Sequence, residues 1–207
     1  KDVCEIFKYA QEQNINILDT AESYGIAHEL IGKFHKESNL KFRINTKFKD
    51  FGKESDFDKR IDRLLDQLNV QKISTLMIHS TSPINNFKIQ NFKKIIEDRV
   101  SNFGASIYVD NDLNSIDLNS IDVIQIPYNL LDNLFYRKNL IEKLKKYKIK
   151  IDVRSVFLQG ILLNKDLIQN GKLTAIHAEL ENLKKNLNNI YSLKEYSLCY
   201  PFMNSDI

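Results

Sequence analysis

Apolar and polar positions follow two periods along the chain. Apolar side chains recur every three or four residues within Asp2–Gln13, Ala27–His35 and Asp56–Leu68, which is the period of amphipathic helices. Short apolar runs at Ile15–Ala21 and Lys41–Phe48 separate these segments and are typical of strands. The N-terminal part of the chain therefore predicts strands that alternate with helices.

The same alternation continues to the C-terminus, so that six strands are expected in total. The further predicted strands are Ile73–Ser80, Phe103–Val109, Ile121–Asn129 and Lys150–Phe157, and the further helices are Phe87–Ile96, Asn139–Lys146 and Ala175–Leu187. Asp110–Asn119 is expected to be a connector with one helical turn. The pattern contains no linker, so residues 1–207 are predicted to form one domain.

Alternating strands and helices predict a parallel sheet, either doubly wound or closed as a (β/α)₈ barrel. A doubly wound dinucleotide-binding sheet usually has a glycine-rich first turn, and neither GxGxxG nor a P-loop occurs in this sequence. Polar residues suited to chemistry also follow several successive strands, as they do in barrels.

Four such residues lie at or just past the ends of predicted strands: Asp19, Tyr24, Lys47 and His79, the tetrad. Each alone has an ordinary explanation, as a turn cap, a packing aromatic, a solvated lysine or a core histidine. Since the carboxyl ends of parallel strands meet at one edge, the four together favour a site.

The chemistry of the tetrad is that of proton transfer. A tyrosine with a pKa near 10 is a weak acid, and a nearby ammonium group lowers that pKa. Lys47 is the candidate cation, and Asp19 would hold it by a charged hydrogen bond. His79 would orient a substrate carbonyl or share in the proton transfer.

The motif LDTAESYG (Leu18–Gly25) resembles the aldo-keto reductase signature DTAxxYG. Three further segments follow it in the order seen in that family: HELIGKF (His28–Phe34), NTKF, which contains Lys47, and LMIHS, which contains His79. GASIY (Gly104–Tyr108), QIPYNLLD (Gln125–Asp132) and RSVFLQGIL (Arg154–Leu162) are similar to later family segments. The resemblance thus covers nearly the whole chain in collinear order.

The resemblance implies a (β/α)₈ barrel and an enzyme that reduces an aldehyde or ketone, such as a sugar derivative, with a nicotinamide cofactor. NADP(H) is the expected cofactor and NAD(H) the alternative. Ser106 and Gln125 would bond the nicotinamide carboxamide, Asn129 would lie close by, and Arg154 would stack on the ring. Two residues depart from the family pattern, because many members have Asn where Ile107 stands and an aromatic where Arg154 stands.

By the same resemblance, the chain is expected to hold barrel strands two to seven. The first family strand would precede Lys1, and the eighth would follow Ile207. The barrel domain would then be truncated at both ends, without the segment that grips the cofactor phosphates in the family. The segment alone would then bind the cofactor poorly.

Composition narrows the functional classes further. The chain is 43% hydrophobic and 28% charged with a formal net charge of +3, which is typical of a globular domain with neither a nucleic-acid-binding stripe nor a membrane span. Cys4 and Cys199 are far apart and without CxxC spacing, so a cytoplasmic protein is expected.

The remaining histidines do not indicate a metal site. His28, His35 and His177 have neither HxxxH nor HExxH spacing, and His28 and His35 are expected on a helix surface. A small carbonyl compound is therefore the expected partner, and the oligomeric state stays open. The alternative function is a non-catalytic aldo-keto reductase-like binding or regulatory subunit, which the intact tetrad disfavours.

Overall fold

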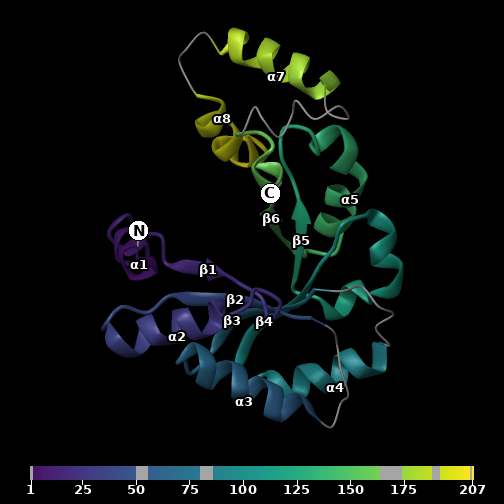
Figure 1. The fold of residues 1–207 in the computed structure, drawn as a ribbon. Coiled ribbons are helices and arrows are strands. Elements are labelled where there is room, and N and C mark those ends of the chain that lie inside the picture. The colour runs from purple at the N-terminus through teal and green to yellow at the C-terminus, as the bar shows by residue number, and fades with distance from the viewer. Residues whose placement is uncertain (1, 50–55, 80–85, 164–173, 188–191, 206) are drawn as a thin grey trace. The chain divides into compact units, whose positions relative to one another are not determined.

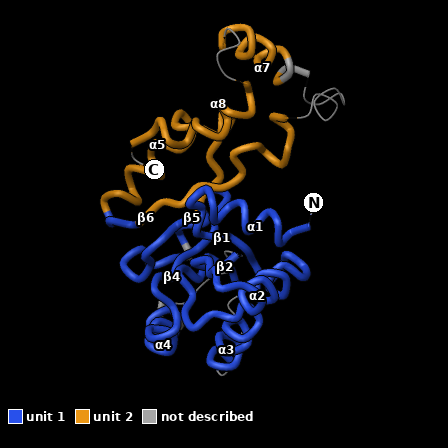
Figure 2. Tube along the Cα trace, turned by 90° about the vertical axis from the view of Figure 1, so that its left-hand side faces the viewer, with its two compact units in different colours: residues 1–124, 147–149 blue, residues 125–146, 150–207 orange. Residues whose placement is uncertain are grey.

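The computed structural model describes residues 2–49, 56–79, 86–163, 174–187, 192–205 and 207. Within this part the chain divides into two compact units (Figure 2). Unit 1 comprises Lys1–Ile124 and Tyr147–Ile149, and unit 2 comprises Gln125–Lys146 and Lys150–Ile207. The division reflects where contacts within the chain are dense and does not test the number of domains. The expectation of one barrel domain therefore stays a prediction.

Six strands form one sheet in the order in which they occur along the chain. They are β1 (Ile17–Asp19), β2 (Arg43–Phe48), β3 (Ile73–Ile78), β4 (Val100–Ser106), β5 (Val123–Pro127) and β6 (Lys150–Arg154). The pairings of β1 with β2, β2 with β3, and β3 with β4 are parallel. A doubly wound sheet would reverse its strand order at a switch point, whereas a barrel wall keeps consecutive order.

The described α-helices of unit 1 are α1 (Val3–Glu12), α2 (Ala27–Glu37), α3 (Phe57–Leu68) and α4 (Asn86–Ile96). Figure 1 shows α2, α3 and α4 following one another along the same face of the sheet. The buried residues of α3 are Phe57, Ile61, Leu64 and Leu68, which recur at intervals of three and four. This spacing places them on one side of the helix, facing the strands.

Close approach of α2 to α3 depends on a glycine. A Cβ atom added to Gly32 would lie 1.8 Å from the carbonyl oxygen of Gln67. Beside this contact, Ile31, Phe34, Phe42, Ile44 and Leu68 form a buried cluster. Phe7 of α1 completes it edge-on, with its ring centroid 5.2 Å from that of Phe34.

Two short 3-10 helices, η2 (Asp110–Ser115) and η3 (Leu118–Ser120), precede β5, where the sequence predicted a connector with one helical turn. Unit 2 contains α5 (Leu134–Lys146), η4 (Leu158–Gly160), α7 (Thr174–Asn186), α8 (Leu193–Cys199) and η5 (Tyr200–Met203). Its buried cluster is Leu162, Leu180 and Leu193. None of the helices in the described ranges is long and apolar enough to cross a membrane.

Most strands are a few residues shorter than predicted, and the bounds of β4 and α5 differ most from the prediction. Strand β4 begins at Val100 and ends at Ser106, whereas Phe103–Val109 was expected, because Ser101 and Asn102 weaken the apolar pattern where pairing with β3 begins. Helix α5 begins at Leu134 rather than Asn139. The side chain of Asn133 accepts a hydrogen bond from the backbone nitrogen of Phe135 at 3.0 Å and starts the helix early.

Candidate active site

Three of the four tetrad residues come from the carboxyl ends of parallel strands in unit 1. Asp19 is the last residue of β1, Lys47 is the penultimate residue of β2, and His79 follows β3 directly. The backbone nitrogen of Thr20 donates to the carbonyl of Asn45 at 2.8 Å, and that of His79 donates to the carbonyl of Phe48 at 2.8 Å. These bonds continue the ladder past the strand ends and hold the three positions at one edge.

Lys47 is the electrostatic centre of this edge. Its side chain is fully buried, and its Nζ lies 2.6 Å from Oδ2 of Asp19, whose side chain is 39% exposed. The same Nζ donates to the carbonyl oxygen of Thr20 at 3.0 Å. Burial of an ammonium group is costly unless it is paired and hydrogen-bonded, and Asp19 and Thr20 supply these partners to Lys47.

Tyr24 reaches the same place from the turn between β1 and α2. Its backbone nitrogen donates to the carbonyl of Ala21 at 3.0 Å, and Gly25, with φ of +57°, continues the turn. Nζ of Lys47 lies 5.7 Å from the centroid of the tyrosine ring. The ring of Tyr24 meets that of His79 edge-on, with centroids 6.0 Å apart.

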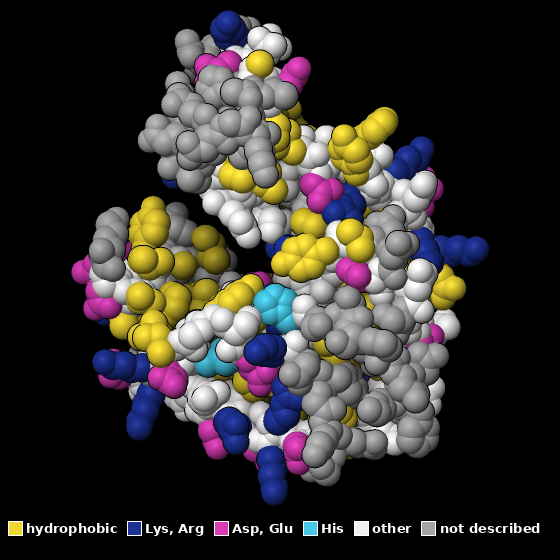
Figure 3. Space-filling view, turned by 45° about the vertical axis from the view of Figure 1, so that its right-hand side comes forward, with side chains coloured by type: hydrophobic (Ala, Val, Ile, Leu, Met, Phe, Trp, Pro, Cys, Tyr) yellow, Lys and Arg dark blue, Asp and Glu magenta, His cyan; other side chains and the backbone are white. Residues whose placement is uncertain are grey.

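The structure thus brings all four tetrad residues together. Tyr24 is 47% exposed while Lys47 is fully buried beneath it, so the phenol is open to a small molecule and the cation is not. Figure 3 shows imidazole side chains beside basic and acidic ones on one face of the molecule. The arrangement can supply a proton from a phenol next to a fixed positive charge.

The turn that carries Tyr24 is held by Glu22. Its Oε2 accepts hydrogen bonds from the backbone nitrogen of Lys49 at 3.0 Å and from Nη2 of Arg60 at 3.1 Å. The guanidinium of Arg60 lies 3.9 Å from the centroid of Phe48. Glu22 and Arg60 were not predicted from the sequence, since no local pattern connects a residue in a turn with a residue on α3.

His28 and His35 are buried, with 6% and 1% exposure, so the expectation that they lie on a helix surface is wrong. Positions 28, 31 and 35 share one face of a helix, and Ile31 shows that this face is the buried one. Nε2 of His28 lies 2.8 Å from Oγ1 of Thr46, next to the tetrad lysine along β2. Burial lowers the pKa of His28, and the charge of Glu22 partly offsets this.

The predicted cofactor residues also lie at strand ends. Ser106 ends β4 and is buried in unit 1. In unit 2, Gln125 is buried within β5, Asn129 is buried just after it, and Arg154 ends β6. Oδ1 of Asn129 accepts hydrogen bonds from the backbone nitrogens of Leu131 and Asp132, at 2.9 and 3.0 Å. Asn129 therefore shapes its own turn, and the cofactor contacts of the other three stay predictions.

The segment after β6 has an unusual backbone. Ser155, Leu158 and Gln159 have φ values of 60°, 47° and 54°, in the left-handed region that favours glycine, and Gly160 follows at 88°. Non-glycine residues in this region cost free energy and cluster at ligand sites. The backbone of this segment is therefore a second candidate for ligand contact, within unit 2.

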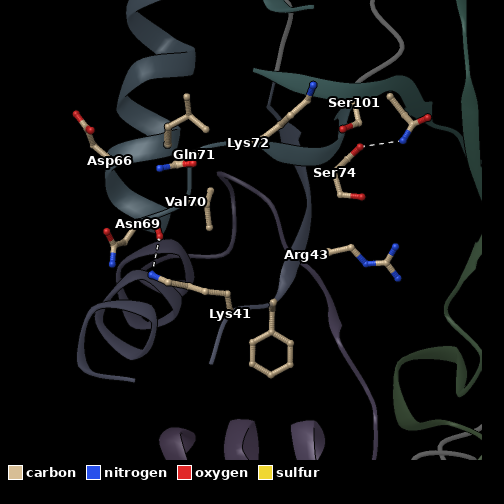
Figure 4. Close-up of a pocket in the computed structure, with 12 residues that line it drawn as sticks. Lys41, Arg43, Asp66, Asn69, Val70, Gln71, Lys72, Ser74 and Ser101 are labelled. Atoms are coloured by element: carbon tan, nitrogen blue, oxygen red, sulfur yellow. Dashed lines mark hydrogen bonds between the residues drawn. The ribbon is translucent and has the colours of Figure 1, made fainter. Parts of the chain in front are cut away.

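The described residues also contain a hollow of about 850 Å³ at the opposite edge of the unit 1 sheet. Figure 4 shows Arg43, Ser74 and Ser101 around it, at or near the first residues of β2, β3 and β4. None of the tetrad residues lines it. No group of three or more metal-binding side chains occurs in the part of the chain that the structure describes.

Fold and site together define a class: an α/β protein with consecutive strands whose polar tetrad gathers at the carboxyl ends of the first three. A search of the curated proteins found no significant match. A comparison with protein families matches residues 1–198 to the aldo/keto reductase family. The chain belongs to the aldo/keto reductase family, whose members are oxidoreductases that typically use nicotinamide cofactors.

Solved structures of the same family resemble the chain in fold. A glycerol dehydrogenase from Gluconobacter oxydans matches with a TM-score of 0.80 at 18% identity, over 99% of this chain and 73% of that one. The holo form of an aldo-keto reductase from Bacillus halodurans matches at 0.77 and 21% identity, over 95% and 70%. An aldo/keto reductase from Brucella melitensis matches at 0.66 and 18% identity, over 97% and 74%. The fold is therefore that of a (β/α)₈ barrel, of which the described residues provide six strands.

Proposed function

We propose that the protein reduces an aldehyde or ketone to an alcohol, with Tyr24 as the proton donor. The observation that carries this proposal is the fully buried Lys47, paired with Asp19 at 2.6 Å and lying 5.7 Å from the centroid of the Tyr24 ring. A cation fixed beside a phenol favours the phenolate that proton donation leaves behind, which makes the phenol a better acid.

Each tetrad residue has a distinct task in this scheme. Tyr24 donates its proton to the carbonyl oxygen as negative charge develops there, and Lys47 stabilises the resulting phenolate. Asp19 keeps Lys47 in its position and charged. His79, edge-on to Tyr24, holds the carbonyl oxygen by a hydrogen bond.

A nicotinamide cofactor, when bound, supplies a hydride to the carbonyl carbon. Ser106 and Gln125 fit its carboxamide, because a hydroxyl and an amide can both donate and accept hydrogen bonds, and both side chains lie at or near the carboxyl ends of strands. Asn129 fits less well, since Leu131 and Asp132 already occupy its carbonyl oxygen. Arg154 would stack on the ring through its planar guanidinium.

We infer NADP(H) as the cofactor, with NAD(H) as the alternative, and a small carbonyl compound such as a sugar derivative as the substrate. The family membership supports a nicotinamide, and the similar glycerol dehydrogenase is consistent with a small polar substrate. The cytoplasmic location stays a prediction.

The test measures NADPH and NADH binding to the protein by fluorescence titration, followed by turnover of a generic aldehyde. Tyr24→Phe keeps the ring and removes the proton donor, so kcat should fall by about 10² to 10⁴ with cofactor binding unchanged. Binding of neither cofactor would favour the non-catalytic subunit. Equal turnover by Tyr24→Phe would remove Tyr24 from the mechanism.

A further inference from the structure

The tetrad histidine has a partner that the proposed reaction does not use. Oγ of Ser23 lies 3.1 Å from Nδ1 of His79, within hydrogen-bonding distance. Ser23 directly precedes Tyr24 in the turn between β1 and α2, so one short turn carries both the phenol and the contact to the imidazole. Ser23 is exposed and therefore adds little to the packed core.

In a neutral imidazole, this contact can determine which ring nitrogen of His79 carries the proton. One ring nitrogen carries a proton and donates, while the other has a lone pair and accepts. A hydroxyl can donate to Nδ1 only when that nitrogen is unprotonated, and the proton then resides on Nε2. A carbonyl oxygen requires a donor, so only the ring nitrogen that carries the proton can hold it.

We propose that Ser23 is a positioning residue, whose hydroxyl donates to Nδ1 of His79 and holds the ring as the Nε2–H tautomer, ready to donate to a substrate carbonyl. The inference deepens the proposed function and rests on it for its catalytic consequence. The tautomer itself is a property of the ring and can be measured without substrate.

The backbone around Ser23 supports a fixed hydroxyl. The backbone nitrogens of Tyr24 and Glu22 donate to the carbonyls of Ala21 and Lys47, each at 3.0 Å. The Glu22 side chain is held by Lys49 and Arg60. Ser23 is thus flanked by Glu22, which is bonded to β2, and by Tyr24, which is bonded within the turn, so its hydroxyl needs little ordering to reach the imidazole.

The first experiment observes the tautomer directly. Long-range ¹H–¹⁵N NMR spectra of the ring nitrogens should show His79 as the Nε2–H form in the wild-type protein, with His79→Gln used to assign the signal. Ser23→Ala should populate both tautomers, and Ser23→Thr, which keeps the hydroxyl, should restore the wild-type spectrum. An unchanged spectrum in Ser23→Ala would overturn the proposal.

The second experiment measures the consequence for turnover. Loss of one neutral hydrogen bond should lower kcat about five- to tenfold in Ser23→Ala, with the KM for the cofactor unchanged. Ser23→Thr should recover most of the rate. Ser101→Ala, at an exposed position on the opposite edge of the same sheet, is the matched control and should turn over like the wild type.

A double-mutant cycle separates positioning from a general structural role. If Ser23 acts through His79, Ser23→Ala should cost nothing further in a His79→Gln background. An equal loss in both backgrounds would overturn the proposal. A wild-type protein that reduces no carbonyl compound would overturn the proposed function, while the NMR spectra would still decide whether Ser23 holds the ring.

Discussion

Two lysines near opposite ends of β2 are held in different ways. Lys47 is fully buried and paired with Asp19 at 2.6 Å. Lys41, two residues before the strand, is exposed, and its Nζ donates to the carbonyls of His35 at 2.7 Å and Asn69 at 3.2 Å. These carbonyls lie in the last turn of α2 and just after α3, where a cation offsets the negative end of each helix dipole.

The difference shows that the large hollow and the candidate active site lie at opposite edges of the same sheet. The hollow next to Lys41 is large, but its lysine holds helix ends together. The edge next to Lys47 concentrates a buried charge, a phenol and an imidazole in contact distance. Buried charge is costly, so a fold keeps it mainly where it has a structural or chemical task.

Replacement of Lys47 should lower activity more than any of the changes that follow. A small effect would contradict the contrast between the tetrad edge and the opposite hollow. We expect Lys47→Met to lower kcat for aldehyde reduction at least about a hundredfold, because Tyr24 loses its cation. Lys72→Met, which changes an exposed lysine at the opposite hollow, should remain within about twofold of wild type. Steady-state kinetics measure both, with circular dichroism to check folding. Equal losses in the two variants would mean that the hollow belongs to the active site.

Replacement of Asp19 should follow, with an effect on stability as well as rate. Asp19→Asn leaves the buried ammonium of Lys47 without its counterion. We expect a loss of about 1 to 3 kcal/mol in the free energy of unfolding, reduced from the fully buried case because the Asp19 side chain is partly exposed.

Urea denaturation measures this loss, and one control variant and one second background test its cause. Asp66→Asn, at the opposite hollow, should change the free energy of unfolding by less than about 0.5 kcal/mol. In a Lys47→Met background, Asp19→Asn should be nearly neutral, since no buried charge remains to be paired. A full loss in that background would assign Asp19 a role independent of Lys47.

The two buried histidines, one near each end of α2, make stability depend on pH. Burial lowers the pKa of His28 and of His35 below the ordinary 6.5, although a hydrogen bond to the carbonyl of Leu68 raises that of His35 in part. Below pH 6.5 the unfolded chain binds protons that the folded chain excludes. Stability should therefore be complete above this pH and decline as the pH falls through it.

His28→Gln and His35→Gln should each flatten this decline, and urea denaturation at several pH values measures it. The glutamine amide can still donate to Thr46 or to the carbonyl of Leu68. His35 also accepts from the backbone nitrogen of Phe42 at 3.0 Å, a bond that protonation removes. A decline of the same steepness in both variants would assign the acid sensitivity to other groups.

Replacement of Lys41 should have the smallest effect. Lys41→Met removes two hydrogen bonds to helix-end carbonyls, so we expect a loss of about 0.5 to 1 kcal/mol in the free energy of unfolding. Aldehyde turnover should stay at the wild-type rate, because the residue lies at the edge opposite to the tetrad. Thermal unfolding and the same kinetic assay measure the two quantities. A loss of turnover without a loss of stability would contradict the structural role.

Local periodicity predicted much of the fold, and it failed where a single side chain overrides the pattern. The helix over Phe57–Leu68 was predicted because its apolar residues repeat every three or four positions. The start of α5 was missed because Asn133 begins the helix before the apolar pattern does. His28 and His35 were misplaced because a polar residue on an apolar face looks like a surface residue until its hydrogen-bond partners are known.

The sequence by itself determined the parallel sheet, the order of the tetrad and the family resemblance, since these depend on residue types and spacing along the chain. Only the tertiary structure decided that Lys47 is buried while Lys41 is exposed, and that Ser23 meets His79 across 56 positions of sequence. Burial and pairing arise from contacts between distant segments. Local sequence patterns do not predict these contacts, because a lysine can be exposed to water or buried in a sheet with the same neighbours along the chain.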